Sequence, residues 1–199
     1  MKHSLALILL IAAPVLGTTA LDASGSSAAG RGGALLRNSV LSSHNGTRQM
    51  FGVAPLAWSD ALAAEAMRHA QYMAQTGVYG HDRTPGRRKK MGENIWRGQR
   101  GAFSYEVMVG TMTAESRNFR PGAYPNVSQT GEWSQVSHFT QIIWPTTTEV
   151  GCALASSQST DYFVCRYAPA GNKDGVYLER ARGPIAARPD IRRSAERRD

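Results

Sequence analysis

Three stretches in the first two thirds of the chain carry apolar residues at helical spacing, and they cover residues 35–51, 59–77 and 103–119. The apolar stripe of the second stretch consists of Leu62, Ala66, Ala70 and Met73. Ser59 or Asp60 offers this stretch an N-terminal cap, and Gly77 offers a stop. We therefore expect three helices before residue 120.

The last third of the domain has the alternation that is typical of strands. Phe139–Trp144 is predicted to be a strand, and residues 150–155 and 162–168 are predicted to form a hairpin around the polar loop 156–161. Helices come first and antiparallel strands later. This order predicts an α+β domain whose helices cover a sheet.

The two ends of the chain differ in composition from the part between them. Residues 1–20 have a basic start and an apolar run from Leu5 to Val15. This run has about the length of the apolar region of a secretory signal peptide and is short for a membrane span, so residues 1–20 are predicted to be a signal peptide. An uncleaved anchor or a core helix is the alternative. Residues 21–34 are predicted to be a flexible Gly/Ser/Ala linker, 35–178 one folded domain, and 179–199 a basic flexible tail. We expect export, either to a periplasm or to the external medium.

The chain is basic, with a net charge of +8 and a pI of about 9.9. Part of the charge lies in the tail and part in the run Arg87-Arg88-Lys89-Lys90. No aromatic residues interleave with this run and no recognition-helix pattern accompanies it, which argues against nucleic-acid binding. The run is either a solvated basic loop or a contact for anionic lipid or polymer.

Cys152 and Cys165 are the two cysteines of the chain. Their flanks alternate as strands do, and pairing them across the hairpin also pairs Ala155 with Tyr162. Directly opposed residues on antiparallel strands lie within disulfide reach. In an exported protein such a pair favours a disulfide, and two buried free thiols are the alternative.

Two distant segments carry the candidate chemistry. His81 precedes Gly92-Glu93-Asn94, and His138 lies in the segment 137–144. Brought together, these residues form a metal site, an acid–base pair or a buried polar network. Zn²⁺ accepts imidazole and carboxylate ligands, and two imidazoles also suit copper. Metal binding would weaken below about pH 6, where imidazole protonates.

Seven short motifs, in order, resemble those of the CAP domain, the group of cysteine-rich secretory proteins, antigen-five allergens and plant pathogenesis-related proteins. They are His44-Asn45-x-x-Arg48, Pro55-Leu56-x-Trp58-x-x-x-Leu62-Ala63, His81, Gly92-Glu93-Asn94-Ile95, His138 to Trp144, Gly151-Cys152-Ala153 and Val164-Cys165-x-Tyr167-x-Pro169-x-Gly171-Asn172. The resemblance implies a three-layer α-β-α sandwich with a central antiparallel sheet and a large open cleft.

The resemblance also implies which residues line that cleft. It assigns to it a tetrad of His81, Glu93, Glu115 and His138, and in several relatives the two histidines bind a divalent metal, often zinc. This chain departs from the family pattern at Ser137, where glycine is usual, and at Met112, where an aromatic residue is frequent. A side chain at Ser137 would narrow the cleft or add a hydrogen bond.

Three functions are compatible with these features. The first is a secreted, non-enzymatic protein that binds a small lipid, a sterol or an extracellular protein partner, with no organic cofactor. The second is a metal-dependent hydrolase that uses His81, His138 and Glu93, with Glu93 either as a further metal ligand or as the general base that acts on a metal-bound water. The third is a cell-envelope module that docks through the basic run.

Three further residues near these motifs are expected to have structural roles. We expect Asn94 to hold the backbone rather than a substrate. We expect His69 to lie on the solvated face of its helix, and His44 to cap or pack within its own helix. Acceptor patterns for glycosylation occur at Asn45 and Asn126, and the first lies inside a helix motif.

Overall fold

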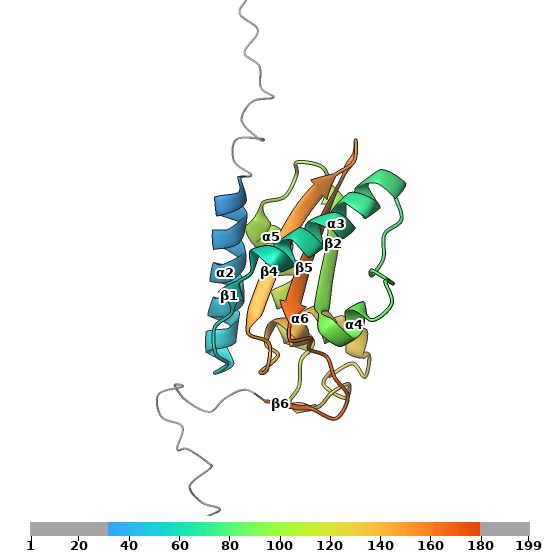
Figure 1. Cartoon of the computed structure of the whole chain (residues 1–199). Helices are drawn as coiled ribbons and strands as arrows, with labels where there is room; N and C mark the ends of the chain where they lie inside the picture. Colours follow the sequence, from blue (N-terminus) through green and yellow to red (C-terminus); the bar gives the residue numbers. More distant parts are fainter. Residues whose placement is uncertain (1–31, 180–199) are drawn as a thin grey trace, which may run out of the picture.

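A four-stranded sheet lies between two layers of helices in the computed structural model, which describes residues 32–179 (Figure 1). The sheet order is β1-β4-β5-β2, with β1 parallel to β4 and the other pairs antiparallel. The strands are β1 (Ala57–Trp58), β2 (Gly92–Gln99), β4 (Glu149–Ser156) and β5 (Thr160–Ala168). A second sheet pairs β3 (Gly122–Ala123) with β6 (Tyr177–Leu178).

Helices cover both faces of the larger sheet. They are α2 (Gly33–Met50), α3 (Asp60–Thr76), α4 (Arg87–Lys90), α5 (Tyr105–Thr113) and α6 (Ser137–Ile142), with 3-10 turns η1 (Ala114–Asn118) and η2 (Trp133–Val136). Figure 1 shows α3 lying across one face, where it contacts β4 and β5, while α2, α5 and α6 pack together on the other. Each face has its own apolar cluster. The predicted α+β class and α-β-α sandwich are confirmed.

The local signals for α3 and for the hairpin are confirmed in detail. Ser59 caps α3 by accepting a hydrogen bond from the backbone N–H of Leu62, and Gly77 ends the helix in the left-handed conformation (φ 72°). In the hairpin, Cys152 lies opposite Cys165 and the two form a disulfide. The alternative of free thiols is therefore wrong. The third predicted helix, 103–119, is shorter than expected, because α5 ends at Thr113 and continues as the 3-10 turn η1.

The segment that was predicted as the strand Phe139–Trp144 is mostly the helix α6, which ends at Ile142. Its aromatic and β-branched residues favour a strand locally. Tertiary contacts at both ends override that preference. The carboxylate of Glu115 accepts the backbone N–H groups of His138 and Phe139, and Arg48 donates to the carbonyl of Ile142. A six-residue helix exists here because both of its ends have charged partners from elsewhere in the chain.

The residues that the structure describes begin inside the predicted linker 21–34. Helix α2 begins at Gly33, two residues inside the predicted linker 21–34. The predicted signal peptide (1–20), the rest of that linker up to residue 31, and residues 180–199 of the basic tail lie outside the described residues and stay predictions. Within residues 32–179, no helix has the length and apolarity that crossing a membrane requires.

Candidate functional site

His81 is held by a carboxylate that the neighbouring strand supplies. Its Nδ1 lies 2.7 Å from Oε1 of Glu93 on β2, and the same oxygen accepts the backbone N–H of Asp82 at 3.1 Å. Because a carboxylate only accepts, Nδ1 of His81 carries the proton. Nε2 then has a free lone pair. The Glu93 side chain is 1% exposed and that of His81 is 53% exposed, so a buried acid orients an accessible base.

His138 has the same arrangement with a different acid. Its Nδ1 lies 2.5 Å from Oε1 of Glu115, and Oε2 of Glu115 accepts the first backbone N–H groups of α6. One carboxylate thus caps the helix and orients the imidazole that the helix carries. Met112, where the family frequently has an aromatic residue, is buried in the core. The substitution leaves the contact between Glu115 and His138 in place.

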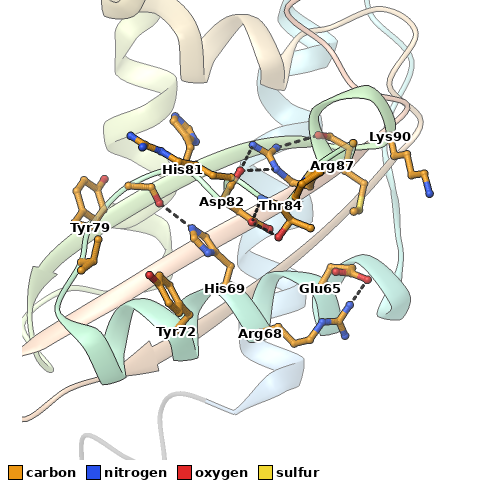
Figure 2. A pocket seen from close by; sticks show the side chains of 16 residues that line it. Glu65, Arg68, His69, Tyr72, Tyr79, His81, Asp82, Thr84, Arg87 and Lys90 are labelled. Carbon is orange, nitrogen blue, oxygen red and sulfur yellow. Dashed lines mark hydrogen bonds and ion pairs between the residues drawn. The ribbon is translucent and has the colours of Figure 1, made fainter.

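The two histidines line one cavity. This cavity measures about 460 Å³, and His81, Glu93 and His138 all contribute to its wall. Glu115 does not line it and contacts it through His138. Ser137 lines the cavity as well, and its hydroxyl donates to the carbonyl of Ser134. A larger cavity of about 970 Å³ adjoins it and shares His81, Arg87 and Met91 (Figure 2).

Glu93 is the centre of a buried charge network. Burial alone would raise the pKa of its carboxyl, but the hydrogen bond from His81 and the positive charges of Arg166 and Arg87 outweigh burial and lower that pKa. Arg166 lies 2.5 Å from Oε2 of Glu93, and Arg87 lies 3.5 Å from Oε1. The carboxylate is therefore ionised and a weak base, and among residues 32–179 its Oε2 has the ion pair with Arg166 but no hydrogen bond.

A second group of metal-type donors lies behind Glu93 and was missed in the sequence. Ligand atoms of His69, Asp82 and Glu93 all lie within 4.8 Å of one another. Arg166 already bridges the two acids, because it lies 2.7 Å from Oδ2 of Asp82 as well as against Glu93. A metal ion there would have to displace this guanidinium, so the group is a structural ion network as it stands.

His69 does not lie on a solvated face, contrary to the expectation. It is 7% exposed, and its Nε2 donates to the carbonyl of Gly80 at 2.8 Å (Figure 2). The spacing contained this information, because His69 lies three residues after Ala66 and four before Met73 on the buried stripe. The long-range pair of Asp82 with Arg166 had no comparable signal in one sequence.

A chain of hydrogen bonds supports His138 from behind. Asn94 on β2 donates to the carbonyl of His138 and to the hydroxyl of Tyr167. The Tyr167 hydroxyl contacts Nε2 of His44 at 2.8 Å, and Nδ1 of His44 donates to the carbonyl of Val40 within α2. Asn94 holds the backbone, as expected. His44 does bond within its own helix, but it also joins α2 to the sheet.

The basic run at 87–90 is not a loop. It forms α4, and Arg87 is buried, donating to the carbonyls of Asp82 and Met91. Arg87 is therefore excluded from the predicted anionic contact, because its charge serves the network around Glu93. Arg88, Lys89 and Lys90 are exposed and keep that possibility open.

An α-β-α sandwich with a disulfide-tied hairpin and two histidine–glutamate pairs at one cavity defines the class of protein. The chain belongs to the CAP family, because residues 41–167 match the family model described as "CAP: Cysteine-rich secretory protein family". It is 32% identical over 150 residues to human Golgi-associated plant pathogenesis-related protein 1, and the aligned region covers 74% of this chain and 92% of that protein. It is also 32% identical over 137 residues to pathogenesis-related protein 1A of Nicotiana tabacum, covering 68% and 76%.

Solved structures agree on the fold. NaASP2, crystallised with Zn²⁺, superposes with a TM-score of 0.63 at 24% identity, covering 76% of this chain and 88% of that one. BmVAL-1 superposes with a TM-score of 0.64 at 21% identity, covering 77% and 86%. At these sequence identities the similarity shows a shared fold and gives no information about a ligand of this chain.

Proposed function

We propose that this chain is an extracellular binding protein without catalytic turnover, whose smaller cavity holds a divalent metal ion and, beside it, a small lipid, a sterol or an extracellular protein partner. The observation that carries the proposal is the pairing of each cavity histidine with its own carboxylate. His81 pairs with Glu93 and His138 with Glu115, both through Nδ1. Each histidine therefore offers Nε2 as a ligand atom.

The donor set fits zinc. Metal-bound histidines usually donate their other ring N–H to a carboxylate, which fixes the tautomer and raises the basicity of the ligand nitrogen. His81 and His138 both have this support. Two imidazoles leave coordination positions for water or for an oxygen of the bound partner. NaASP2, which has the same fold, was crystallised with Zn²⁺.

The surroundings of the two histidines also support a role in binding. Tyr124 and Trp133 line the same cavity, their rings lie 6.2 Å apart, and Trp133 is 45% exposed. An amphiphile can place its apolar part on these rings and a polar group near the imidazoles. The disulfide supports an oxidising, extracellular location, as does the family model, which is described as a cysteine-rich secretory protein family.

The hydrolase alternative has weaker support. A general base needs a free lone pair, an accessible position and suitable basicity. Glu93 is buried, carries a lowered pKa and is surrounded by His81, Arg166 and Arg87. The hydroxyl of Ser137, the nearest serine in sequence to His138, donates to a backbone carbonyl. These groups are arranged to hold the site rather than to transfer protons.

Zinc titration by calorimetry at pH 7.5 tests the metal site. We expect His138→Ala to reduce Zn²⁺ affinity at least tenfold, because it removes one of two protein ligands. His69→Gln is the matched control, since it alters the group behind Glu93 and leaves the cavity imidazoles in place. Unchanged affinity in His138→Ala, or a larger loss in His69→Gln, contradicts the proposed site.

A second measurement tests the absence of turnover. The zinc-loaded protein is incubated with a panel of peptide and ester substrates and, separately, with a labelled sterol and a labelled fatty acid. We expect retention of a lipid without product. Hydrolysis that is lost in Glu93→Gln would replace the binding function with the hydrolase.

A further inference from the structure

The larger cavity adjoins the smaller one at the segment that carries His81. It lies between α3 and residues 78–91 and has a volume of about 970 Å³. Most of the residues in its wall carry a polar or charged group, although apolar atoms make up somewhat more than half of the exposed wall; its aliphatic side chains are Val78, Pro85 and Met91. An acyl chain bound here would desolvate charged and hydroxyl groups without giving them partners. The lining therefore favours an amphiphilic ligand that has both apolar faces and many polar groups.

One end of this cavity presents aromatic rings in fixed positions (Figure 2). Tyr72 is 51% exposed and stacks on the buried imidazole of His69, with ring centroids 6.1 Å apart and planes inclined by 12°. Tyr79 is held by its hydroxyl, which donates to the carbonyl of Ile95 at 3.2 Å, and by Arg97, which lies 4.6 Å from its ring centroid. Rigid tyrosines of this kind offer contact area at low entropic cost.

The rest of the wall carries cations in excess. Within residues 32–179, the acid Glu65 pairs with Arg68, and Asp82 pairs with Arg166 and accepts two hydrogen bonds from Thr84. The buried Arg87 belongs to the network around Glu93. In the same part of the chain, Arg83 and Lys90 line the cavity and have no ion pair or hydrogen bond of their own. Two positive charges are therefore available to a ligand.

We propose that this cavity is a second binding site, which adjoins the metal site at His81 but uses other residues to hold its ligand, and that it takes an acidic oligosaccharide. The apolar faces of sugar rings pack on Tyr72 and Tyr79, and the carboxylates of the sugar chain pair with Arg83 and Lys90. The volume of the cavity is at the upper end of the range for small-ligand sites, which suits several linked sugars. Binding requires no metal ion.

Calorimetry with tetragalacturonic acid, on the metal-free protein at low salt, tests this proposal. We expect saturable binding that Tyr72→Ala and Lys90→Ala each weaken at least fivefold. Lys89→Ala is the matched control, because Lys89 is the neighbouring exposed lysine of α4, carries the same charge and lines neither cavity. It should change the affinity less than twofold, and neutral maltotetraose should bind at least tenfold more weakly.

Three results would overturn the proposal. If tetragalacturonic acid does not bind, acidic oligosaccharides are excluded as the ligand class of this cavity. Equal losses in Lys89→Ala and Lys90→Ala show attraction by net charge alone. Loss of binding in His138→Ala places the sugar in the smaller cavity. Zinc titration of Tyr72→Ala keeps the two proposals separate, because the metal site should retain its affinity in that variant whether or not the sugar binds.

Discussion

Arg48 holds the C-terminal end of α6, the helix that carries His138. Its guanidinium is fully buried, and its partners in the structure are backbone carbonyls. They are the carbonyl oxygens of Ala54, Ile142, Trp144 and Thr147, at 2.6 to 2.9 Å. Two of these carbonyls lie at or just beyond the C-terminal end of α6. We therefore expect Arg48→Met, which keeps a long side chain and removes the donors, to destabilise the protein and loosen α6.

The magnitude follows from what the substitution leaves behind. Four carbonyls lose a charged donor, and each such loss costs about 1 kcal/mol or more when no water replaces it. The variant no longer has to bury a guanidinium, which offsets part of this cost. Burial already lowers the pKa of Arg48 to about 10, which shows that the site penalises the charge. We expect a net loss of about 3 kcal/mol in the free energy of unfolding.

Urea denaturation followed by circular dichroism measures this loss. Arg37→Met is the matched control, because Arg37 lies on the same helix and is exposed. It should change the free energy of unfolding by less than about 0.5 kcal/mol. Arg48→Lys should recover only part of the stability, since one ammonium cannot reach all four carbonyls. A loss below about 1 kcal/mol in Arg48→Met would refute the argument that these bonds hold α6.

Two further predictions concern stability. Burial lowers the pKa of His44 from its usual 6.5 to about 4. Between those pH values the unfolded chain therefore binds a proton at this residue while the folded protein does not, and the free energy of unfolding falls by roughly 3 kcal/mol as the pH drops through that window. In denaturation measured as a function of pH, His44→Gln should flatten the dependence of this free energy on pH. An unchanged dependence in the variant would assign it to other groups. A Cβ on Gly151 would lie 2.2 Å from the backbone nitrogen of Ala63 in α3, so Gly151→Ala should lower the free energy of unfolding by about 2 kcal/mol or more, as measured by thermal unfolding. Gly110→Ala is the control, because it lies in open space on α5 and should be neutral or stabilising. Similar melting temperatures for the two variants would contradict the close packing of α3 on β4.

Local patterns in the sequence were sufficient for the elements that depend on near neighbours. The cap at Ser59, the stop at Gly77 and the stripe between them predict α3 because these contacts lie within a few residues. Alternation predicted the hairpin, and pairing Cys152 with Cys165 across it gave the register, which places Ala155 opposite Tyr162. The ordered CAP motifs indicated the sandwich and the residues that surround the cleft. Each of these inferences rests on short-range geometry or on a known order of motifs.

Tertiary structure decided whatever depends on partners that are distant along the chain. The segment after Ser137 is a helix because Glu115 and Arg48 hold its two ends against its own strand preference. Arg87 lies inside the protein, where the carbonyls of Asp82 and Met91 and the carboxylate of Glu93 serve as its partners, and not on the predicted basic surface. The ion network of Asp82 and Arg166 joins residues 84 positions apart. Local propensity amounts to a few tenths of a kcal/mol per residue, whereas a buried charge without a partner costs several kcal/mol. Only the folded chain specifies which partner is within reach of each buried charge.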